Sequence, residues 1–234
     1  MATPVSKPPF IAIACGGTGG HLFPGMAVGE ELLQRGCAVT LLISPKEIDQ
    51  QAARSAAGME VVTLPAVGLT RYGVARFLAG AWKSYRLAKK LFRSRPPQAV
   101  LAMGGFTSAP PVWAGKGLGA ATFFHESNAI PGRANRWLGR VVDEAFLGLS
   151  QAASYLPNTK ATTTGTPVRA QFQPQDAASC RLALGLDPHR PVLLIMGGSQ
   201  GATGINELVL KTLPTLAVMA RDLQFLHLTG PHDF

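Results

Sequence analysis

Short apolar runs alternate with helical patterns along most of the chain. The runs are rich in Val, Ile, Leu and Phe, whereas the segments between them repeat apolar residues at the spacing of one helix face. The predicted strands are residues 10–15, 38–43, 59–64, 98–103, 120–125, 142–147 and 160–164. The predicted helices are residues 22–35, 45–57, 74–95, 110–116 and 132–140. Near-continuous apolar strands joined by helices predict an α/β fold, a parallel sheet with helices on both faces.

The pattern is interrupted at residues 171–175 (QFQPQ), which are polar and contain a proline. This composition predicts a linker, after which a strand, a helix over about 203–220 and a strand over 224–228 follow. We therefore divide the chain into residues 1–170 and 171–234. So few strands and helices cannot bury both faces of a parallel sheet, and we expect the second domain to be incomplete.

Glycine-rich loops follow three of the predicted strands. They read GGTGGH (16–21), MGGFTSAP (103–110) and GGSQGATG (197–204). Glycine lets a backbone approach a ligand closely, and a strand-to-helix turn presents free N–H groups that bind phosphate. In open α/β sheets, ligands collect at the carboxyl ends of the strands. Three such loops favour phosphate or diphosphate binding, with tight turns alone as the alternative.

Two common phosphate-binding motifs do not fit these loops. A nicotinamide site needs GxGxxG, but the pattern from Gly17 has Leu22 at the last glycine, and the second strand ends at Ser44 without an acid. An ATPase loop needs Ser or Thr after Gly-Lys, but glycine follows Gly115-Lys116. No DxD motif occurs, so we expect no metal and no cofactor.

The positive charge is concentrated in one segment. The net charge is +9, and no Asp or Glu occurs between Glu60 and Glu126, a window that holds nine Lys and Arg residues. The other 13 basic residues are balanced by 13 acidic ones. A localised basic field attracts polyanions such as nucleic acid, phosphates or an anionic membrane surface.

The cysteines and the longest apolar tract indicate the compartment. Cys15, Cys37 and Cys180 are far apart and form no CxxC pair, which predicts reduced thiols and no metal site. The tract 99–115 is broken by glycine and proline pairs, so it predicts a strand, a loop and a helix start rather than a membrane span. We expect a cytoplasmic protein.

Five motifs occur in order between residues 10 and 230: GGTGGHLFPG, MGGF..AP, HESN..PG.ANR, GTPVR and GGSQGA. Together they resemble the MurG family, the bacterial family 28 glycosyltransferases that add N-acetylglucosamine to lipid I. The resemblance implies a GT-B fold, with an acceptor-binding Rossmann-like domain over 1–170 and the start of a UDP-sugar-binding domain over 171–234. It implies inverting, metal-independent transfer from UDP-GlcNAc to the C4 hydroxyl of the muramyl sugar, which gives lipid II for peptidoglycan synthesis.

The resemblance also implies roles for residues of these motifs. The implied catalytic residues are His21, as candidate base or acceptor-positioning residue, and Glu126. The implied substrate-binding residues are Thr18, Gly19, Gly20, Asn128, Arg169 and Ser199. The implied acceptor-loop residues are Gly16, Gly17, Gly104, Gly105 and His125.

Each of these roles has a structural alternative. His21 could be a helix-start histidine held by a backbone contact. His125 and Glu126 could be a buried pair that braces its loop, and Arg169 could be an exposed linker arginine.

The predicted helix 74–95 carries two stripes at helical spacing. One stripe is Leu78, Trp82, Tyr85, Ala88 and Phe92, and the other is Lys83, Arg86, Lys90 and Arg93. Apolar and aromatic residues flanked by cations suit an anionic membrane surface, where the lipid-linked acceptor would lie. The expected membrane contacts are Leu78, Trp82, Tyr85, Lys83, Arg86 and Lys90, at the cytoplasmic face of the plasma membrane. The alternative is a core-facing apolar stripe with solvated cations.

The chain departs from the family in two ways. Family members continue for about 100–150 residues more, and many carry arginine where Thr203 stands. We therefore expect little transferase activity from residues 1–234 alone. Two competing readings remain: a different GT-B enzyme acting on a lipid acceptor such as diacylglycerol, and a non-enzymatic anion-binding module whose basic aromatic segment binds nucleic acid. The family reading expects no nucleic acid.

Overall fold

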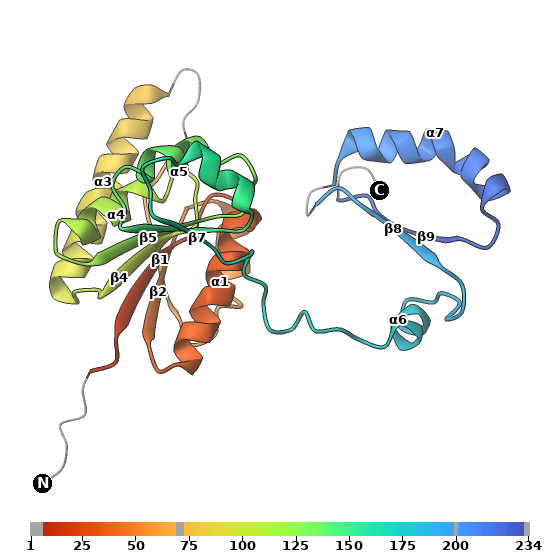
Figure 1. Ribbon diagram of the computed structural model, residues 1–234, viewed down its shortest axis with the longest axis horizontal. Helices are drawn as coiled ribbons and strands as arrows, with labels where there is room; N and C mark the ends of the chain where they lie inside the picture. Colours follow the sequence, from red (N-terminus) through yellow and green to blue (C-terminus); the bar gives the residue numbers. More distant parts are fainter. Residues whose placement is uncertain (1–6, 69–72, 199–200, 232–234) are drawn as a thin grey trace, which may run out of the picture. The chain divides into compact units, whose positions relative to one another are not determined.

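The computed structural model describes residues 7–68, 73–198 and 201–231. The chain divides between Phe172 and Gln173 into two compact units, both drawn in Figure 1. Of the site residues predicted above, Ser199 lies outside the described residues.

Strands and helices alternate through the first unit. Its strands are β1 (Phe10–Ala14), β2 (Ala38–Ile43), β3 (Glu60–Thr63), β4 (Ala99–Ala102), β5 (Ala121–Glu126), β6 (Glu144–Leu147) and β7 (Ala161–Thr163). Its helices are α1 (Gly19–Gln34), α2 (Glu47–Ala53), α3 (Val74–Ser94), α4 (Ala109–Lys116), α5 (Arg133–Leu138) and the 3₁₀ helix η1 (Ser150–Tyr155).

In the described part of this unit, seven strands form one parallel sheet in the order β3-β2-β1-β4-β5-β6-β7. Ile13 of β1 lies beside Leu41 of β2 on one side and Leu101 of β4 on the other. The strand order reverses between β1 and β4, so the loops after these two strands are neighbours at the carboxyl edge of the sheet. Open α/β sheets bind ligands at this place. The predicted α/β fold with a parallel sheet is confirmed.

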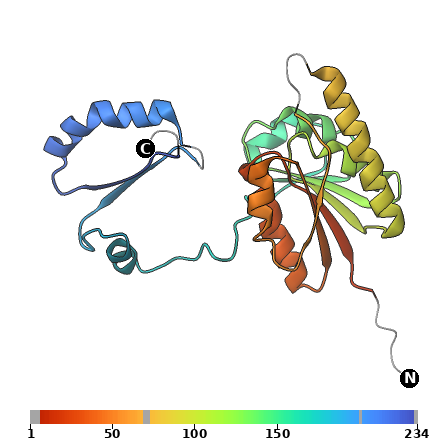
Figure 2. The same cartoon turned by 180° about the vertical axis from the view of Figure 1, so that it is seen from behind.

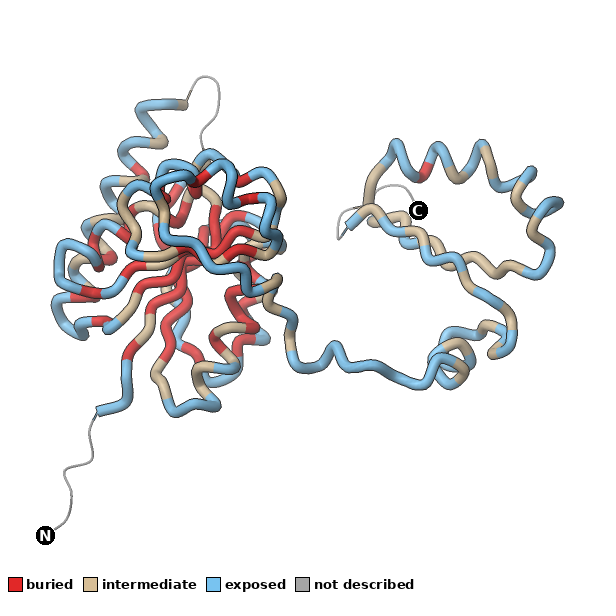
Figure 3. Tube along the Cα trace, viewed as in Figure 1, coloured by how far each residue is buried: buried red, intermediate tan, exposed pale blue. Residues whose placement is uncertain are grey.

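Helices cover both faces of the sheet (Figures 1 and 2). Alternate strand residues point to opposite faces, as Ile13 and Ala12 of β1 show. Ile13 packs with Leu22 and Met26 of α1, whereas Ala12 belongs to the cluster that contains Phe92 of α3. The central strands are therefore buried on both sides, which Figure 3 shows as the red interior of this unit. This rigid core fixes the positions of the loops at the strand ends.

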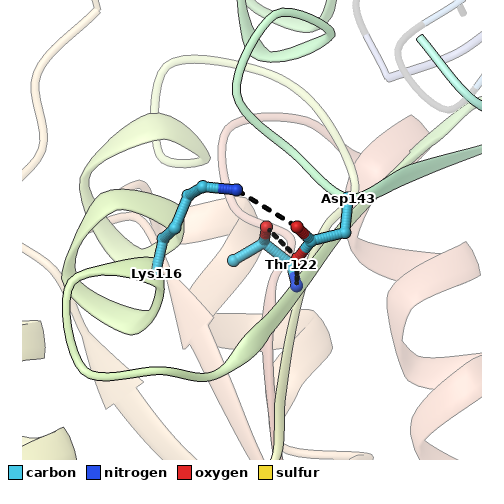
Figure 4. Close-up of polar contacts among 3 residues, drawn as sticks. All are labelled: Lys116, Thr122 and Asp143. Atoms are coloured by element: carbon cyan, nitrogen blue, oxygen red, sulfur yellow. Dashed lines mark hydrogen bonds and ion pairs between the residues drawn. The ribbon is translucent and has the colours of Figure 1, made fainter.

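A polar cluster joins α4, β5 and the residue that precedes β6 (Figure 4). The Asp143 carboxylate accepts hydrogen bonds from the Thr122 amide (2.7 Å) and hydroxyl (2.8 Å), and from Nζ of Lys116 (3.1 Å). Burial alone would raise the pKa of Asp143, but these hydrogen bonds outweigh it and lower the pKa. The stabilisation is therefore present above the ordinary pKa of 3.8 and is lost as the pH falls through the lowered value. Because the cluster is largely exposed, its contribution is small, about 1 kcal/mol at most.

The second unit contains α6 (Ala177–Ala183), β8 (Val192–Met196), α7 (Thr203–Met219) and β9 (Gln224–Leu228). The two strands pair in parallel, with Leu194 beside Leu226. One helix over a two-stranded sheet leaves apolar side chains in solvent, and Leu194 is 51% exposed. Asn206 is buried and joins α7 to β9, because its Nδ2 donates to the Thr229 carbonyl (2.9 Å) and its Oδ1 lies 2.9 Å from Nε2 of His227.

The predicted elements differ from the observed ones mainly at helix ends. Helix α1 begins at Gly19 rather than at residue 22, because glycine is a poor helix former and conceals the start. Helix α6 was not predicted from the sequence. Its signal is an N-cap, since the Asp176 side chain accepts a hydrogen bond from the Ser179 amide (2.8 Å).

Candidate functional site

The first glycine loop joins β1 to α1 at the carboxyl edge of the sheet. Thr18 is the N-cap residue of α1 and has extended backbone angles, but no side chain caps the helix. Gly19 and Gly20 therefore form a first helical turn that has no side-chain cap within the described residues. Such an uncapped start is suited to binding the oxygens of a phosphate group.

His21 projects from this first turn onto the second glycine loop. A Cβ atom on Gly104 would lie 2.9 Å from Cε1 of His21, and one on Gly105 would lie 3.1 Å from Cδ2. Both glycines have positive φ angles, +106° and +78°. The two loops predicted to face the acceptor therefore meet around one imidazole ring.

The surroundings of His21 favour its neutral form. Burial lowers the pKa of His21 below its ordinary value of 6.5, while Glu126, a hydrogen bond to the Met103 backbone and Asp49 raise it by less. A neutral ring that donates one N–H to a carbonyl keeps a lone pair on its other nitrogen. The His21 ring is thus equipped to accept a proton at neutral pH.

Glu126, at the end of β5, is buried and fully hydrogen-bonded. Its Oε1 accepts from the amide (2.9 Å) and Nδ2 (2.7 Å) of Asn128. Its Oε2 accepts from the Gly132 amide (2.9 Å) and Nδ2 of Asn135 (3.0 Å). Both carboxylate oxygens are occupied by donors of the loop that follows and of α5, so the geometry favours the bracing alternative over a catalytic role. The exposed Asn128 is held in place by this bracing.

His125 is also buried and hydrogen-bonded. Its Nε2 lies 3.0 Å from the Gly165 carbonyl, which can only accept, so Nε2 carries the proton. Its Nδ1 faces the Ser127 hydroxyl at 3.4 Å. Burial lowers the pKa of His125 more than the Gly165 hydrogen bond and Glu126 raise it. His125 therefore connects β5 to the segment after β7, which also favours a bracing role.

Arg169 lies between two aromatic rings. Its guanidinium is 4.7 Å from the ring centroid of Phe23 in α1 and 5.3 Å from that of Phe172. Its Nε is buried and has no hydrogen-bond partner among the described residues. Phe23 also contacts the glycine loop, because a Cβ on Gly19 would lie 3.3 Å from its ring. The stack thus places Arg169 near the start of α1 rather than free in a linker.

Helix α3 carries the predicted membrane-contact residues, and the structure separates them. Leu78 and Trp82 are 59% and 61% exposed, and Trp82 stacks on the partly buried Tyr85 at 5.6 Å. The remaining members of the predicted stripe, Ala88 and Phe92, are fully buried in the core. The apolar stripe is therefore solvent-facing only in the N-terminal turns of α3, which extend beyond the sheet (Figure 1).

Cations surround this exposed part of α3. An open hollow of about 630 Å³ is lined by Leu78, Ala81, Trp82, Tyr85, Lys89, Pro110 and Trp113. Lys83, Arg86 and Lys90 are exposed and form no ion pair within the described residues. We call Leu78, Trp82, Tyr85, Lys83, Arg86 and Lys90 the α3 surface. Among the helices of the described residues, none is both long and apolar enough to cross a bilayer.

The sequence motifs missed several residues that shape the loops. Asp49, Ser44, Lys46 and Thr107 all hydrogen-bond to the first glycine loop or to one another. Thr107 lies within the second glycine loop but at an unspecified position of its motif, and the other three lie in no recognisable pattern. Within the described part of the chain, no group of His, Cys, Asp or Glu side chains is arranged to hold a metal ion.

Known proteins resemble this chain along nearly its whole length. A UDP-N-acetylglucosamine--N-acetylmuramyl-(pentapeptide) pyrophosphoryl-undecaprenol N-acetylglucosamine transferase from Geobacter sulfurreducens is 37% identical over 231 residues, 95% of this chain and 62% of the relative. The enzyme of that name from Prochlorococcus marinus is 37% identical over 227 residues, 96% of this chain and 61% of the relative. The chain thus spans about three fifths of the length of these relatives.

Solved structures share the fold. The crystal structure of MurG from Acinetobacter baumannii superposes with a TM-score of 0.70 at 24% identity, over 97% of this chain and 62% of that one. A UDP-N-acetylglucosamine 2-epimerase superposes with a TM-score of 0.63 at 17% identity, over 94% and 63% of the two chains.

The parallel sheet, the glycine loops at its switch point and these neighbours define the fold as that of the GT-B class. The N-terminal domain of glycosyltransferase family 28 matches residues 11–147, and its C-terminal domain matches residues 192–234. The chain belongs to glycosyltransferase family 28, as the motif resemblance predicted.

Proposed function

We propose that this chain transfers N-acetylglucosamine from UDP-GlcNAc to the C4 hydroxyl of the muramyl sugar of lipid I. The product is lipid II, a precursor of peptidoglycan, and the reaction takes place at the cytoplasmic face of the bacterial plasma membrane. The observation that carries this proposal is the His21 ring packed against the second glycine loop, where burial lowers its pKa. The names of the relatives supply the substrates.

The proposed chemistry needs one proton acceptor. His21 takes the proton of the acceptor hydroxyl while the hydroxyl oxygen attacks C1 of the donor sugar. The bond from C1 to the UDP oxygen breaks, and the configuration at C1 is inverted. The departing diphosphate carries away the negative charge. The uncapped amides of Gly19 and Gly20 and the guanidinium of Arg169 are the proposed groups for phosphate oxygens.

Asn128 is the proposed contact to the donor sugar, held by Glu126 through two hydrogen bonds. The proposed membrane partner of the α3 surface is an anionic lipid bilayer. Its exposed Leu78 and Trp82 lie beside unpaired cations, and this combination favours an interface of apolar chains and anionic headgroups.

The test is transfer of labelled GlcNAc from UDP-GlcNAc to a short-chain lipid I analogue, with diacylglycerol as the competing acceptor. We expect weak product formation with the lipid I analogue alone, and none from the His21→Gln variant. Binding of the analogue by the wild-type chain is measured in parallel, because residues 1–234 are expected to turn over slowly. Transfer to diacylglycerol, or no binding of the lipid I analogue, would overturn the proposal.

A further inference from the structure

Asp49 of α2 is a buried carboxylate beneath the first glycine loop. Its Oδ2 accepts a hydrogen bond from the Gly17 amide (2.6 Å) and a second, very short one from the Ser44 hydroxyl. Its other oxygen, Oδ1, is buried without a hydrogen-bond partner in the described residues. Burying a carboxylate with an unsatisfied oxygen is costly, so its presence at a ligand-binding edge points to a functional reason.

Two further side chains hydrogen-bond to the backbone carbonyls of the first glycine loop. Nζ of Lys46 donates to the Gly17 carbonyl (2.8 Å), and the Thr107 hydroxyl donates to the Gly16 carbonyl (2.7 Å). A Cβ on Gly16 would lie 2.2 Å from the Ser44 amide nitrogen, so the loop backbone lies directly against the end of β2. The loop is therefore held from β2, α2 and the second glycine loop without any ligand.

These bonds decide which loop groups remain for a ligand. The Gly17 amide is occupied by Asp49, so it does not face the phosphate, although the sequence motif makes it a candidate. Its φ of +117° directs the chain into Thr18 and the uncapped start of α1. The orientation of that helix start, and with it the position of His21, follows from the Gly17 conformation.

We propose that Asp49 is a positioning residue of the acceptor site, which fixes the first glycine loop so that the start of α1 and His21 face the ligand. This inference rests on the proposed function, because it assigns Asp49 to the same site. The carboxylate acts on His21 through its charge as well. Glu126 from β5 and Asp49 from α2 are the charged groups that raise the pKa of His21, against the larger lowering by burial.

The experiment compares the wild-type chain with Asp49→Asn and with the control Glu47→Gln. Glu47 lies in the same first turn of α2 and is exposed, so its variant loses the same charge without touching the loop. Amide exchange of Gly17 and the titration of His21 are followed by NMR, and binding of the short-chain lipid I analogue is measured alongside.

In Asp49→Asn we expect Gly17 exchange to rise about tenfold or more, the pKa of His21 to fall, and the analogue to bind about tenfold more weakly. Glu47→Gln should match the wild type in all three. Unchanged Gly17 exchange in Asp49→Asn, or unchanged analogue binding once the loop is loosened, would overturn the inference.

Amide exchange of Gly17 in the wild-type chain is a second test, which holds even if Asp49→Asn fails to fold. In the wild-type chain the Gly17 amide should exchange slowly, because the buried Asp49 carboxylate accepts its hydrogen bond. An unprotected Gly17 amide would overturn the inference. If Gly17 and His21 respond to Asp49→Asn while the wild type binds no lipid I analogue, the proposed acceptor is wrong and the positioning by Asp49 is supported.

Discussion

The imidazole of His21 occupies the space that any side chain on Gly104 would need. An added Cβ would lie 2.9 Å from Cε1 and 3.0 Å from Nδ1 of the ring, so the ring would have to shift. The left-handed φ of +106° excludes most other residues for a second reason. The glycine pair of the second loop is therefore explained by the histidine of the first, and the two motifs form one site.

Replacing Gly104 tests this relationship. Gly104→Ala introduces backbone strain of about 1–2 kcal/mol and pushes a methyl group into His21, so we expect both destabilisation and a loss of at least about tenfold in transfer or acceptor binding. Gly119→Ala is the matched control, because Gly119 also has a left-handed φ (+84°) but open space around it. Thermal unfolding and His21 ring signals in NMR are the measurements.

Both variants should lose stability, Gly104→Ala the more because of its clash with His21, and only Gly104→Ala should move the His21 signals. If both variants give the same NMR spectra for His21, the position of its ring does not depend on the absence of a side chain at Gly104.

The sequence predicted the sheet and the glycine loops at its carboxyl edge because the signals for both lie in short stretches of sequence. Apolar runs of strand length and glycines after them identify β1 and β4, and a parallel sheet then brings their loops together. The partners of these loops are not local. Asp49 reaches Gly17 across 32 positions, and Thr107 reaches Gly16 across 91. No spacing rule connects such residues before the sheet order is known.

Helix α3 shows the same limit. Helical spacing placed Phe92 on the stripe of Trp82, but the C-terminal part of α3 packs on the sheet and the N-terminal part extends beyond it (Figure 1). Periodicity finds a face of a helix but not how much of that face is covered.

Glu126→Gln distinguishes a brace from a base. The variant replaces one acceptor oxygen by an NH₂ group that faces two N–H donors, so we expect the loop from Ser127 to Asn135 to loosen, with a loss of about 1–3 kcal/mol in stability. Chemical denaturation and binding of UDP-GlcNAc are the measurements. A general base, in contrast, would lose turnover with stability and binding intact.

Glu60→Gln is the control for this prediction. The Glu60 side chain is half exposed. It accepts one hydrogen bond from the Thr40 hydroxyl (2.8 Å) and forms an exposed ion pair with Arg95 (3.8 Å), so its replacement by Gln should have little effect. Full stability of Glu126→Gln with lost transfer would instead assign the proton transfer to Glu126.

His21, which is partly buried, and His125, which is buried, make the folding stability depend on pH. Burial lowers the pKa values of His21 and His125 below 6.5, so the unfolded chain binds more protons than the folded one at pH values just below 6.5. Stability should therefore fall as the pH decreases through 6.5, and stay level above it with respect to these groups. Urea unfolding across this range is the measurement.

His21→Gln and His125→Gln should each reduce the slope of stability against pH. If neither variant changes the slope of the unfolding free energy against pH, folding does not lower the pKa of either ring.

The α3 surface makes a prediction about lipid composition. Trp82→Ser removes a large exposed ring and should reduce binding to phosphatidylglycerol vesicles about tenfold or more, while Lys83→Gln and Arg86→Gln should each weaken it about fivefold and lose their effect at high salt. Val168→Ser is the control, because Val168 is 65% exposed, close to the 61% of Trp82, but lies outside α3. Vesicle sedimentation is the measurement.

Equal loss in Val168→Ser would show that general hydrophobicity drives the binding. Salt-sensitive binding to DNA without vesicle binding would assign the cations of α3 to nucleic acid instead.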